Sequence, residues 1–284
     1  MKRLLLILVA TLWAGVAMAH NNDPADALRA RQAALSAELA RNAFGQPIHL
    51  DSQEQGSRLN GDVYALLNHP FADLARSIRQ PAQWCEVVIL VINVKRCEAA
   101  EGGVALNVGR KFDQPLQDTY RLQFTHRVAA DAPGYLQLHL GADAGPMGTS
   151  DYRIVLEAIP SDSRHSFIHL RYAYTSGFAA RVAMQGYLST VGRDKVGFSI
   201  VDRQPDGQPV YVRSLRGALE RTTMRYYLAI AAYLDSLSVP PPERIERRLR
   251  AWFAATERYP RQLHEMDEDT YLALKRSELR RSSS

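Results

Sequence analysis

Tyrosine has the clearest potential for binding chemistry in this 284-residue chain, which contains 13 tyrosines. Several of them fall on strand or helix faces that we expect to point inward: Tyr172, Tyr174, Tyr226, Tyr227 and Tyr233. Each tyrosine offers an apolar ring and one hydroxyl group, so the set suits a pocket for an amphipathic molecule. The same side chains would also fit a sheet–helix core with hydroxyl groups at its margin, and both interpretations stay open at this point.

Glu157, His169 and Arg171 have the strongest potential for acid–base chemistry. His169 and Arg171 are two positions apart in a predicted strand, so they share a face of the sheet, and Glu157 could lie on the same face and serve acid–base catalysis with them. The alternative is that this face of the sheet is exposed to solvent, where charged and polar residues are expected without any catalytic role. We therefore assign no catalytic residue, and the sequence favours a protein that is not an enzyme.

His165 and His169 are not expected to share a metal ion. In an extended strand, residues four positions apart are separated by roughly 13 Å at ~3.3 Å per residue. The sequence also lacks the HExxH, GxSxG and GxxxxGK[ST] motifs of zinc proteases, serine hydrolases and P-loop proteins. We expect neither a metal ion nor a cofactor.

Cys85 and Cys97 are the two cysteines of the chain. In an oxidising compartment an isolated pair predicts a disulfide, which requires Cα atoms within about 7 Å and hence a chain that turns back. Closing so short a loop stabilises the fold by on the order of 3 kcal/mol in the chain-entropy model. A metal site or a redox pair is the alternative, but the spacing is not CxxC and no histidine adjoins either thiol.

The N-terminus has the pattern of a secretory signal peptide. Lys2 and Arg3 precede an apolar run from Leu4 to Val16, and an AxA-like cleavage site ends at Ala19. The run is shorter than the ~20 residues that a spanning helix needs, although an uncleaved anchor is the alternative. We expect a periplasmic or secreted protein after cleavage near Ala19.

The net charge of +5 and the pI near 9.2 would suggest nucleic-acid binding if the charge lay on the folded body. Two of the five charges belong to Lys2 and Arg3. Residues 243–284 contain ten Lys/Arg and eight Asp/Glu, a further +2, so residues 20–242 carry about +1. No nucleic-acid partner is expected.

Alternating apolar and polar residues over 104–175 predict an antiparallel meander. Turn-forming segments such as Asp131–Gly134 and Pro160–Ser163 separate the alternating runs. An opening strand or hairpin is expected over 48–67, and a further strand over 195–201.

Helical patterns are found before, within and after these strands. Helices are predicted over 24–43, from Pro70 to Ile78, over 178–190 and over 215–237, where a broad apolar stripe recurs. Pro240, Pro241 and Pro242 then break the chain, and charged helices follow near 243–257 and 267–281.

The element order resembles that of the START/SRPBCC helix-grip superfamily, in which a curved sheet wraps a C-terminal helix around an apolar cavity. The resemblance covers residues 46–238 and rests on that order, on the segments His69–Leu74 and Pro81–Cys85, and on the final helix Leu215 to Leu237. It implies an α+β fold for a START-like domain over 46–238, in which a curved antiparallel sheet wraps a long C-terminal helix. The chain adds an N-terminal helical segment (20–45) before this domain and a helical C-terminal extension (239–284) after it. A generic α+β fold is the alternative, since neither the helix at 178–190 nor the extension belongs to the pattern.

The resemblance implies an internal cavity that binds a hydrophobic or amphipathic small molecule or a lipid. The residues predicted to line it are Phe124, Leu138, Leu170, Tyr172, Tyr226 and Ile230. One alternative is a cyclase- or hydrolase-like enzyme that uses polar residues of the same cavity. Another is an envelope interaction module whose partner surface is the 243–281 helices, and the basic amphipathic segment from Arg244 to Phe253 also suits peripheral membrane contact.

Overall fold

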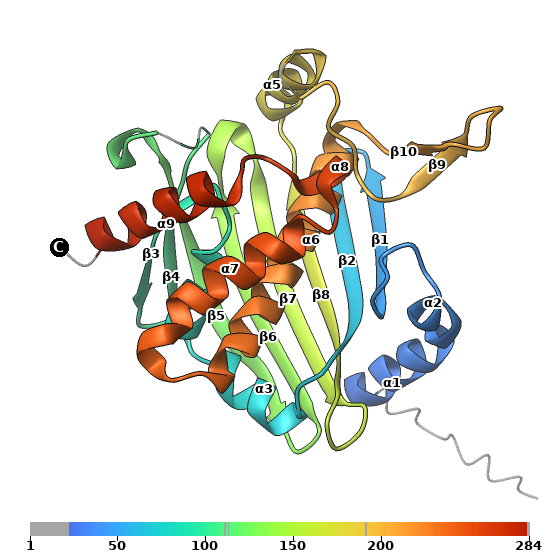
Figure 1. Ribbon diagram of the computed structural model, residues 1–284, viewed down its shortest axis with the longest axis vertical. Helices are drawn as coiled ribbons and strands as arrows, with labels where there is room; N and C mark the ends of the chain where they lie inside the picture. The colour runs from blue at the N-terminus through green and yellow to red at the C-terminus, as the bar shows by residue number, and fades with distance from the viewer. Residues whose placement is uncertain (1–22, 111, 113, 191, 283–284) are drawn as a thin grey trace, which may run out of the picture.

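The computed structural model describes residues 23–282 except positions 111, 113 and 191 (Figure 1). The predicted signal peptide, residues 1–19, lies outside this part of the chain. Within the described ranges, no helix combines the length and the apolar character needed to cross a membrane.

An eight-stranded antiparallel sheet forms the centre of the molecule (Figure 1). Its strands are β1 (Ile48–Gln55), β2 (Arg58–Leu67), β3 (Val94–Ala100), β4 (Gly103–Val108), β5 (Tyr120–Ala132), β6 (Tyr135–Ala144), β7 (Ser150–Pro160) and β8 (Ser166–Thr175). Their order across the sheet is β1-β2-β8-β7-β6-β5-β4-β3. The predicted opening hairpin and the predicted meander are thus confirmed, and the last strand of the meander pairs with β2.

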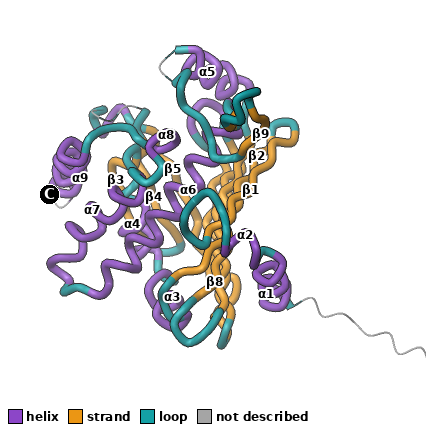
Figure 2. Tube along the Cα trace, turned by 45° about the vertical axis from the view of Figure 1, so that its right-hand side comes forward, coloured by secondary structure: helices purple, strands orange, loops and turns teal. Residues whose placement is uncertain are grey.

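Most of the helices lie on one side of this sheet. Figure 2 shows the sheet nearly edge-on, with α3, α4, α6, α7 and α9 on one side and α1 on the other. The helices are α1 (Pro24–Ala34), α2 (Ser36–Ala40), α3 (Phe71–Ile78), α4 (Pro81–Val88), α5 (Phe178–Ser189), α6 (Ser214–Asp235), α7 (Arg244–Thr256), α8 (Pro260–Leu263) and α9 (Glu268–Ser282). The fold is therefore α+β, with a long helix, α6, lying across an antiparallel sheet as predicted.

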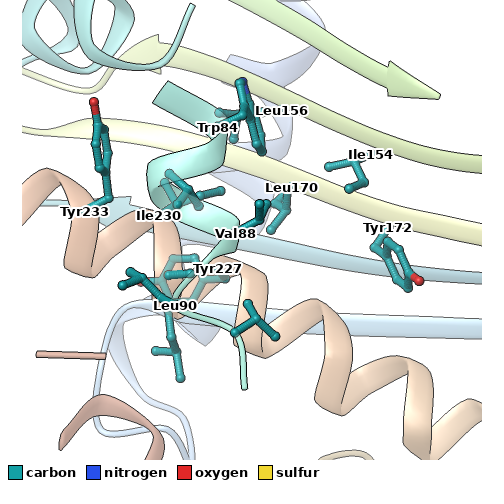
Figure 3. Close-up of a cluster of buried hydrophobic side chains, with 14 of the residues drawn as sticks. Trp84, Val88, Leu90, Ile154, Leu156, Leu170, Tyr172, Tyr227, Ile230 and Tyr233 are labelled. Atoms are coloured by element: carbon teal, nitrogen blue, oxygen red, sulfur yellow. The ribbon is translucent and has the colours of Figure 1, made fainter. Parts of the chain in front are cut away.

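Helix α6 approaches the sheet most closely at Gly61 in β2. A Cβ atom at this position would lie 2.5 Å from Thr223 Oγ1 and 3.3 Å from Leu219 Cγ, so only a glycine allows this contact. Beyond it, the helix and the sheet enclose a dense apolar core around Trp84, Leu156 and Ile230 (Figure 3). Because α6 lies close to β2, the wider gap between helix and sheet is at the other end of the sheet, toward β4 and β5.

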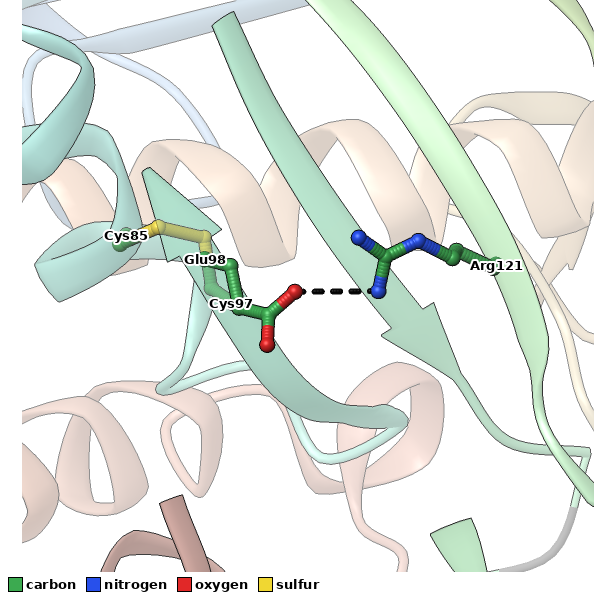
Figure 4. Close-up of a disulfide and its surroundings, with 4 residues drawn as sticks. All are labelled: Cys85, Cys97, Glu98 and Arg121. Atoms are coloured by element: carbon green, nitrogen blue, oxygen red, sulfur yellow. Dashed lines mark hydrogen bonds and ion pairs between the residues drawn. A yellow bond between two sulfur atoms is a disulfide. The ribbon is translucent and has the colours of Figure 1, made fainter. Parts of the chain in front are cut away.

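A disulfide joins Cys85 in α4 to Cys97 in β3, as the sequence predicted (Figure 4). Their Cα atoms lie 5.3 Å apart. Helix α4 starts at Pro81 and is capped by reciprocal hydrogen bonds between Gln80 and Gln83. The disulfide thus fixes this short helix to the edge strand of the sheet.

Residues 195–199 are not a strand, and the predicted strand over 195–201 is wrong in its position. The strand β9 spans Ile200–Arg203 and pairs with β10 (Pro209–Tyr211) in a separate hairpin. The backbone N–H groups of Phe198 and Ser199 instead donate to the carboxylate of Glu220, at 2.6 and 2.9 Å. Glu220 is fully buried in α6, so this loop is anchored to the helix and not to a neighbouring strand.

The C-terminal helices pack into the same core as the sheet. Leu249 and Trp252 of α7 are 1% and 3% exposed, and Trp252 donates a hydrogen bond to the carbonyl of Arg225 in α6. The apolar side of α7, which the sequence suggested for membrane contact, is therefore turned toward the interior.

Helix α9 is attached to β3 by a buried ion cluster. Lys275 is fully buried, and its Nζ donates to the carbonyls of Val91 and Val94 at 2.8 and 2.7 Å. It also pairs with Glu278 at 2.9 Å, and the other oxygen of Glu278 accepts from Lys95 at 2.7 Å. Buried charges persist only when paired and hydrogen-bonded, so this cluster fixes the position of α9.

Candidate functional site

A cavity of about 910 Å³ lies between the sheet and α6, on the β4–β5 side. Ligand pockets commonly measure about 300–1,000 Å³, so its size suits a small organic molecule. Its wall is formed by side chains from the sheet, from α5 and α6, from the loop after α4 and from the C-terminal extension. The C-terminal contribution comes from Glu265, Met266 and Thr270.

The part of the cavity wall formed by β4 and β5 is apolar. Leu106, Leu122 and Phe124 belong to the concave faces of β4 and β5, where alternation points every second residue toward α6. They are 2%, 6% and 3% exposed to solvent. These three side chains have no hydrogen-bonding group, so the β4–β5 part of the wall favours an apolar part of a ligand.

Four tyrosines form an aromatic cluster at one end of the cavity. The ring centroids of Tyr172 and Tyr226 lie 5.5 Å apart, and those of Tyr152 and Tyr174 are separated by the same distance. Tyr152 donates its hydroxyl to Thr149 at 2.7 Å, whereas the hydroxyls of Tyr172 and Tyr226 have no hydrogen-bond partner among the described residues. Figure 3 shows Tyr172 at the margin of the core, with its hydroxyl directed away from the packed side chains.

Burial raises the pKa of Tyr172 well above its usual value, and burial also raises the pKa of Tyr226. Both hydroxyls are therefore neutral and able to donate at physiological pH. Two neutral donors without partners in a cavity are suited to a polar group on a bound molecule.

A charged cluster lies on the cavity wall opposite the apolar strands. Arg225 of α6 and Lys195 of the loop after α5 both pair with Glu265, at 2.6 and 3.1 Å. The Nε atom of Arg225 is buried and makes no hydrogen bond. The cavity therefore combines an apolar wall, a pair of neutral hydroxyls and a cationic pair occupied by a carboxylate.

Comparisons with known proteins give a similarity of fold only. No family model and no curated protein matches the chain. A START superfamily protein from Mycobacterium smegmatis is 9% identical, with a TM-score of 0.30, and covers 47% of this chain and 92% of its own. The Zhui aromatase/cyclase from a Streptomyces species is also 9% identical, with a TM-score of 0.33, and covers 72% and 95%.

Norcoclaurine synthase from Thalictrum flavum is 12% identical, with a TM-score of 0.33, and covers 50% of this chain and 86% of its own. All three proteins are 12% identical to this chain or less, with TM-scores of 0.33 or lower.

Three of the six residues predicted to line the cavity do so: Phe124, Tyr172 and Tyr226. Leu138, Leu170 and Ile230 are fully buried in the dense core and are not among the cavity-lining residues. Leu170 and Ile230 lie where α4 and α6 fill the concave side of the sheet (Figure 3), and Leu138 belongs to the same core cluster. The strand alternation alone does not reveal this filling.

Sequence reasoning missed the cationic pair of the cavity. We predicted a strand that includes Lys195. Arg225 lies beside the apolar stripe of α6, where an arginine is normally solvated. Glu265 belongs to an acidic stretch of the C-terminal extension. A basic residue within an otherwise apolar helix face was the only signal available in the sequence.

Glu157, His169 and Arg171 lie on the opposite face of the sheet from the cavity. His169 is 6% exposed, and its ring lies between two carboxylates, with Nδ1 2.8 Å from Glu157 and Nε2 2.6 Å from Asp62. Arg171 also donates to Asp62, at 2.8 Å. Both ring nitrogens of His169 are thus engaged, so the residue has no open position for proton transfer to a substrate.

This buried network forms a polar core beneath α1. The ring of Tyr64 stacks on His169 with centroids 4.3 Å apart, and the guanidinium of Arg31 in α1 lies over the Tyr64 ring, 4.8 Å from its centroid. Tyr135 donates to Glu157 at 2.6 Å. The network attaches the N-terminal helix to the sheet.

We expect the stabilisation by His169 to depend on pH. Burial disfavours the protonated ring, but hydrogen bonds and charges of Asp62 and Glu157 outweigh burial and raise the pKa of His169. The same contacts lower the pKa of both carboxyl groups although burial alone would raise it. Stability from the histidine is complete below its unfolded pKa of about 6.5 and is lost as the pH rises through the raised folded pKa, while stability from the carboxylates is lost as the pH falls below about 4.

The substitution His169→Gln should therefore cost about 2–3 kcal/mol near pH 5.5, and less at about pH 9. Urea unfolding at both pH values measures the difference. His165→Gln is the control, because His165 pairs with Asp162 in an exposed turn. A cost that is equal at the two pH values would contradict the assignment of a protonated His169.

The described residues include no group of three or more His, Cys, Asp or Glu side chains arranged to hold a metal ion. His165 pairs with Asp162 at 2.8 Å, whereas His169 binds Glu157 and Asp62. The two histidines thus have separate partners.

Proposed function

We propose that this protein is an exported binding protein that holds an amphipathic small molecule or lipid in the cavity under α6. The observation that carries the proposal is the pair of unpartnered tyrosine hydroxyls, Tyr172 and Tyr226, in a cavity of about 910 Å³ whose opposite wall is apolar. An apolar chain would gain about 25 cal/mol for each Å² removed from water. The hydroxyls would orient the polar end of the molecule.

Binding of a neutral hydrophobic probe tests the cavity. We expect N-phenyl-1-naphthylamine to bind saturably and Val108→Trp, which places a large ring in the cavity, to weaken binding at least about tenfold. Val182→Trp is the matched control, because Val182 lies on α5, is 50% exposed and does not line the cavity. Equal binding by the two variants, or no binding by the wild type, would refute the proposal.

The polar contact is tested separately with 1-dodecanol. The double variant Tyr172→Phe/Tyr226→Phe should bind it about fivefold to a hundredfold more weakly, since each of the two lost hydrogen bonds contributes about 0.5–1.5 kcal/mol. Tyr233→Phe is the control: Tyr233 lies on the same helix, but its hydroxyl donates to the carbonyl of Ser77. Displacement of the fluorescent probe measures all three affinities, and an unchanged affinity of the double variant would exclude the tyrosines as ligand contacts.

Export is part of the proposal, supported by the signal-peptide pattern ending at Ala19 and by the Cys85–Cys97 disulfide. Intact-mass measurement of the protein from the periplasmic fraction should give a chain that starts near His20 with both cysteines oxidised. A full-length reduced chain in the cytoplasm would overturn it. Native mass spectrometry of the same sample would reveal any co-purified ligand.

A further inference from the structure

Positive charge is in excess around Glu265. Among the described residues, Lys195, Arg221 and Arg225 surround this single carboxylate. Arg221 is only 5% exposed, and its guanidinium donates to the carbonyl of Val196 at 3.3 Å. Its pKa is lowered by burial and by the charge of Arg225. Two partly buried cations, Lys195 and Arg225, thus pair with one carboxylate, and Arg221 adds a third positive charge nearby.

The other nearby carboxylate, Glu220, is already engaged. It accepts from the backbone N–H groups of Phe198 and Ser199 and from the Ser52 hydroxyl, and its nearest cation is Arg216 at 3.9 Å. Buried cations without a matched anion carry a large desolvation cost. Arg225 lines the cavity, and its Nε atom is buried without a hydrogen-bond partner.

Glu265 has the position of a ligand and not of a structural residue of the domain. It is carried by the linker between α8 and α9, whereas both cations that it binds belong to the body of the protein. Its carboxylate enters the cavity wall from outside and takes up the cationic pair. A carboxylate from solution would find the same two partners if Glu265 moved away.

We propose that Lys195 and Arg225 form a binding site for the carboxylate of an amphipathic anion, which Glu265 occupies until the ligand displaces it. This inference rests on the proposed function and specifies its ligand class. The hydrocarbon chain would lie along Leu106, Leu122 and Phe124. Because Glu265 is part of the C-terminal linker, ligand entry releases the linker segment 264–267.

The test compares two ligands with the same chain, dodecanoate and 1-dodecanol, each below its micelle-forming concentration. We expect the wild type to bind dodecanoate more tightly, since a charge-assisted pair is about twice as strong as a neutral hydrogen bond. Glu265→Gln should raise the affinity for dodecanoate about tenfold and leave that for dodecanol within about twofold. Arg225→Gln should lower the affinity for dodecanoate about tenfold, again without effect on dodecanol.

Glu257→Gln is the matched control, because Glu257 pairs with His264 beside the same linker but does not line the cavity. Hydrogen exchange supplies the second readout: dodecanoate should increase exchange over 264–267, and dodecanol should not. Equal affinities for the two ligands in every variant, or added protection of the linker by dodecanoate, would overturn the inference and leave the cavity proposal standing. Failure of both ligands to bind would overturn the proposed function itself.

Discussion

Glu278→Ala is expected to destabilise the protein by about 3–5 kcal/mol, because it leaves two buried lysines without their carboxylate. Lys95 and Lys275 are 4% and 0% exposed, and Glu278 accepts from both. Equilibrium unfolding in urea measures the loss. Glu246→Ala is the matched control: Glu246 also belongs to the C-terminal extension and pairs with Arg250 and Arg276, but it is 40% exposed, so its removal should cost at most about 1 kcal/mol.

The cost of Glu278→Ala should also shrink as the pH is raised. Burial lowers the pKa of Lys275 to about 8, although Glu278 opposes this effect. Because the unfolded lysine has a pKa of about 10.4, the unfolded chain binds more protons between these values, and stability rises with pH in this window. A neutral Lys275 no longer requires a carboxylate. Equal losses for Glu278→Ala and Glu246→Ala, or a loss that is independent of pH, would show that the cluster is not buried as described.

Truncation after Leu237 should abolish cooperative unfolding. It removes buried apolar side chains from the main core, among them Leu249, Trp252 and Tyr271. Burying each such side chain contributes about 1.5–3 kcal/mol, and a folded domain is stable by only about 5–15 kcal/mol in total. We expect the truncated chain to lose its near-UV circular dichroism and its thermal transition, and with them the binding of the neutral probe.

Deletion of residues 24–40, which removes α1 and α2, is the control at the other end of the chain. Only Ala25, Leu28 and Leu35 of this segment are buried apolar residues, and the segment does not line the cavity. This variant should unfold cooperatively at a lower temperature and still bind the probe. A C-terminally truncated protein that melts like the wild type would instead identify the 243–281 helices as a separate interaction module.

The elements that the sequence predicted well are those with a local signal. The alternation from Tyr120 to Val128 depends only on neighbouring residues, and β5 follows it. The apolar stripe from Leu215 to Leu237 likewise predicts a helix, which is α6. The two cysteines lie 12 residues apart and predict the disulfide that they form. Such patterns require no knowledge of distant parts of the chain.

The polar parts of the structure were less predictable, because their partners are distant in sequence. Asp62 completes the His169 network across 107 positions, and Glu265 reaches Arg225 across 40. Lys275 and Glu278, three residues apart on a charged helix, have the pattern of a solvated ion pair, yet both are buried. Whether a charged side chain is solvated or buried depends on what packs over it, which periodicity does not encode.

The cluster around Glu278 also determines when the chain can finish folding. Its lysine partner Lys95 is made 183 residues earlier, and Tyr271 bonds the carbonyl of Leu90 across 181 residues. Until α9 has been synthesised, the edge strand β3 lacks this helix against it, and the carbonyls of Val91 and Val94 lack the hydrogen bonds from Lys275. Contacts of such high sequence separation form slowly, so the nascent chain keeps this edge open until α9 has been made. Late closure of this edge would suit the export that we propose, because it delays complete folding.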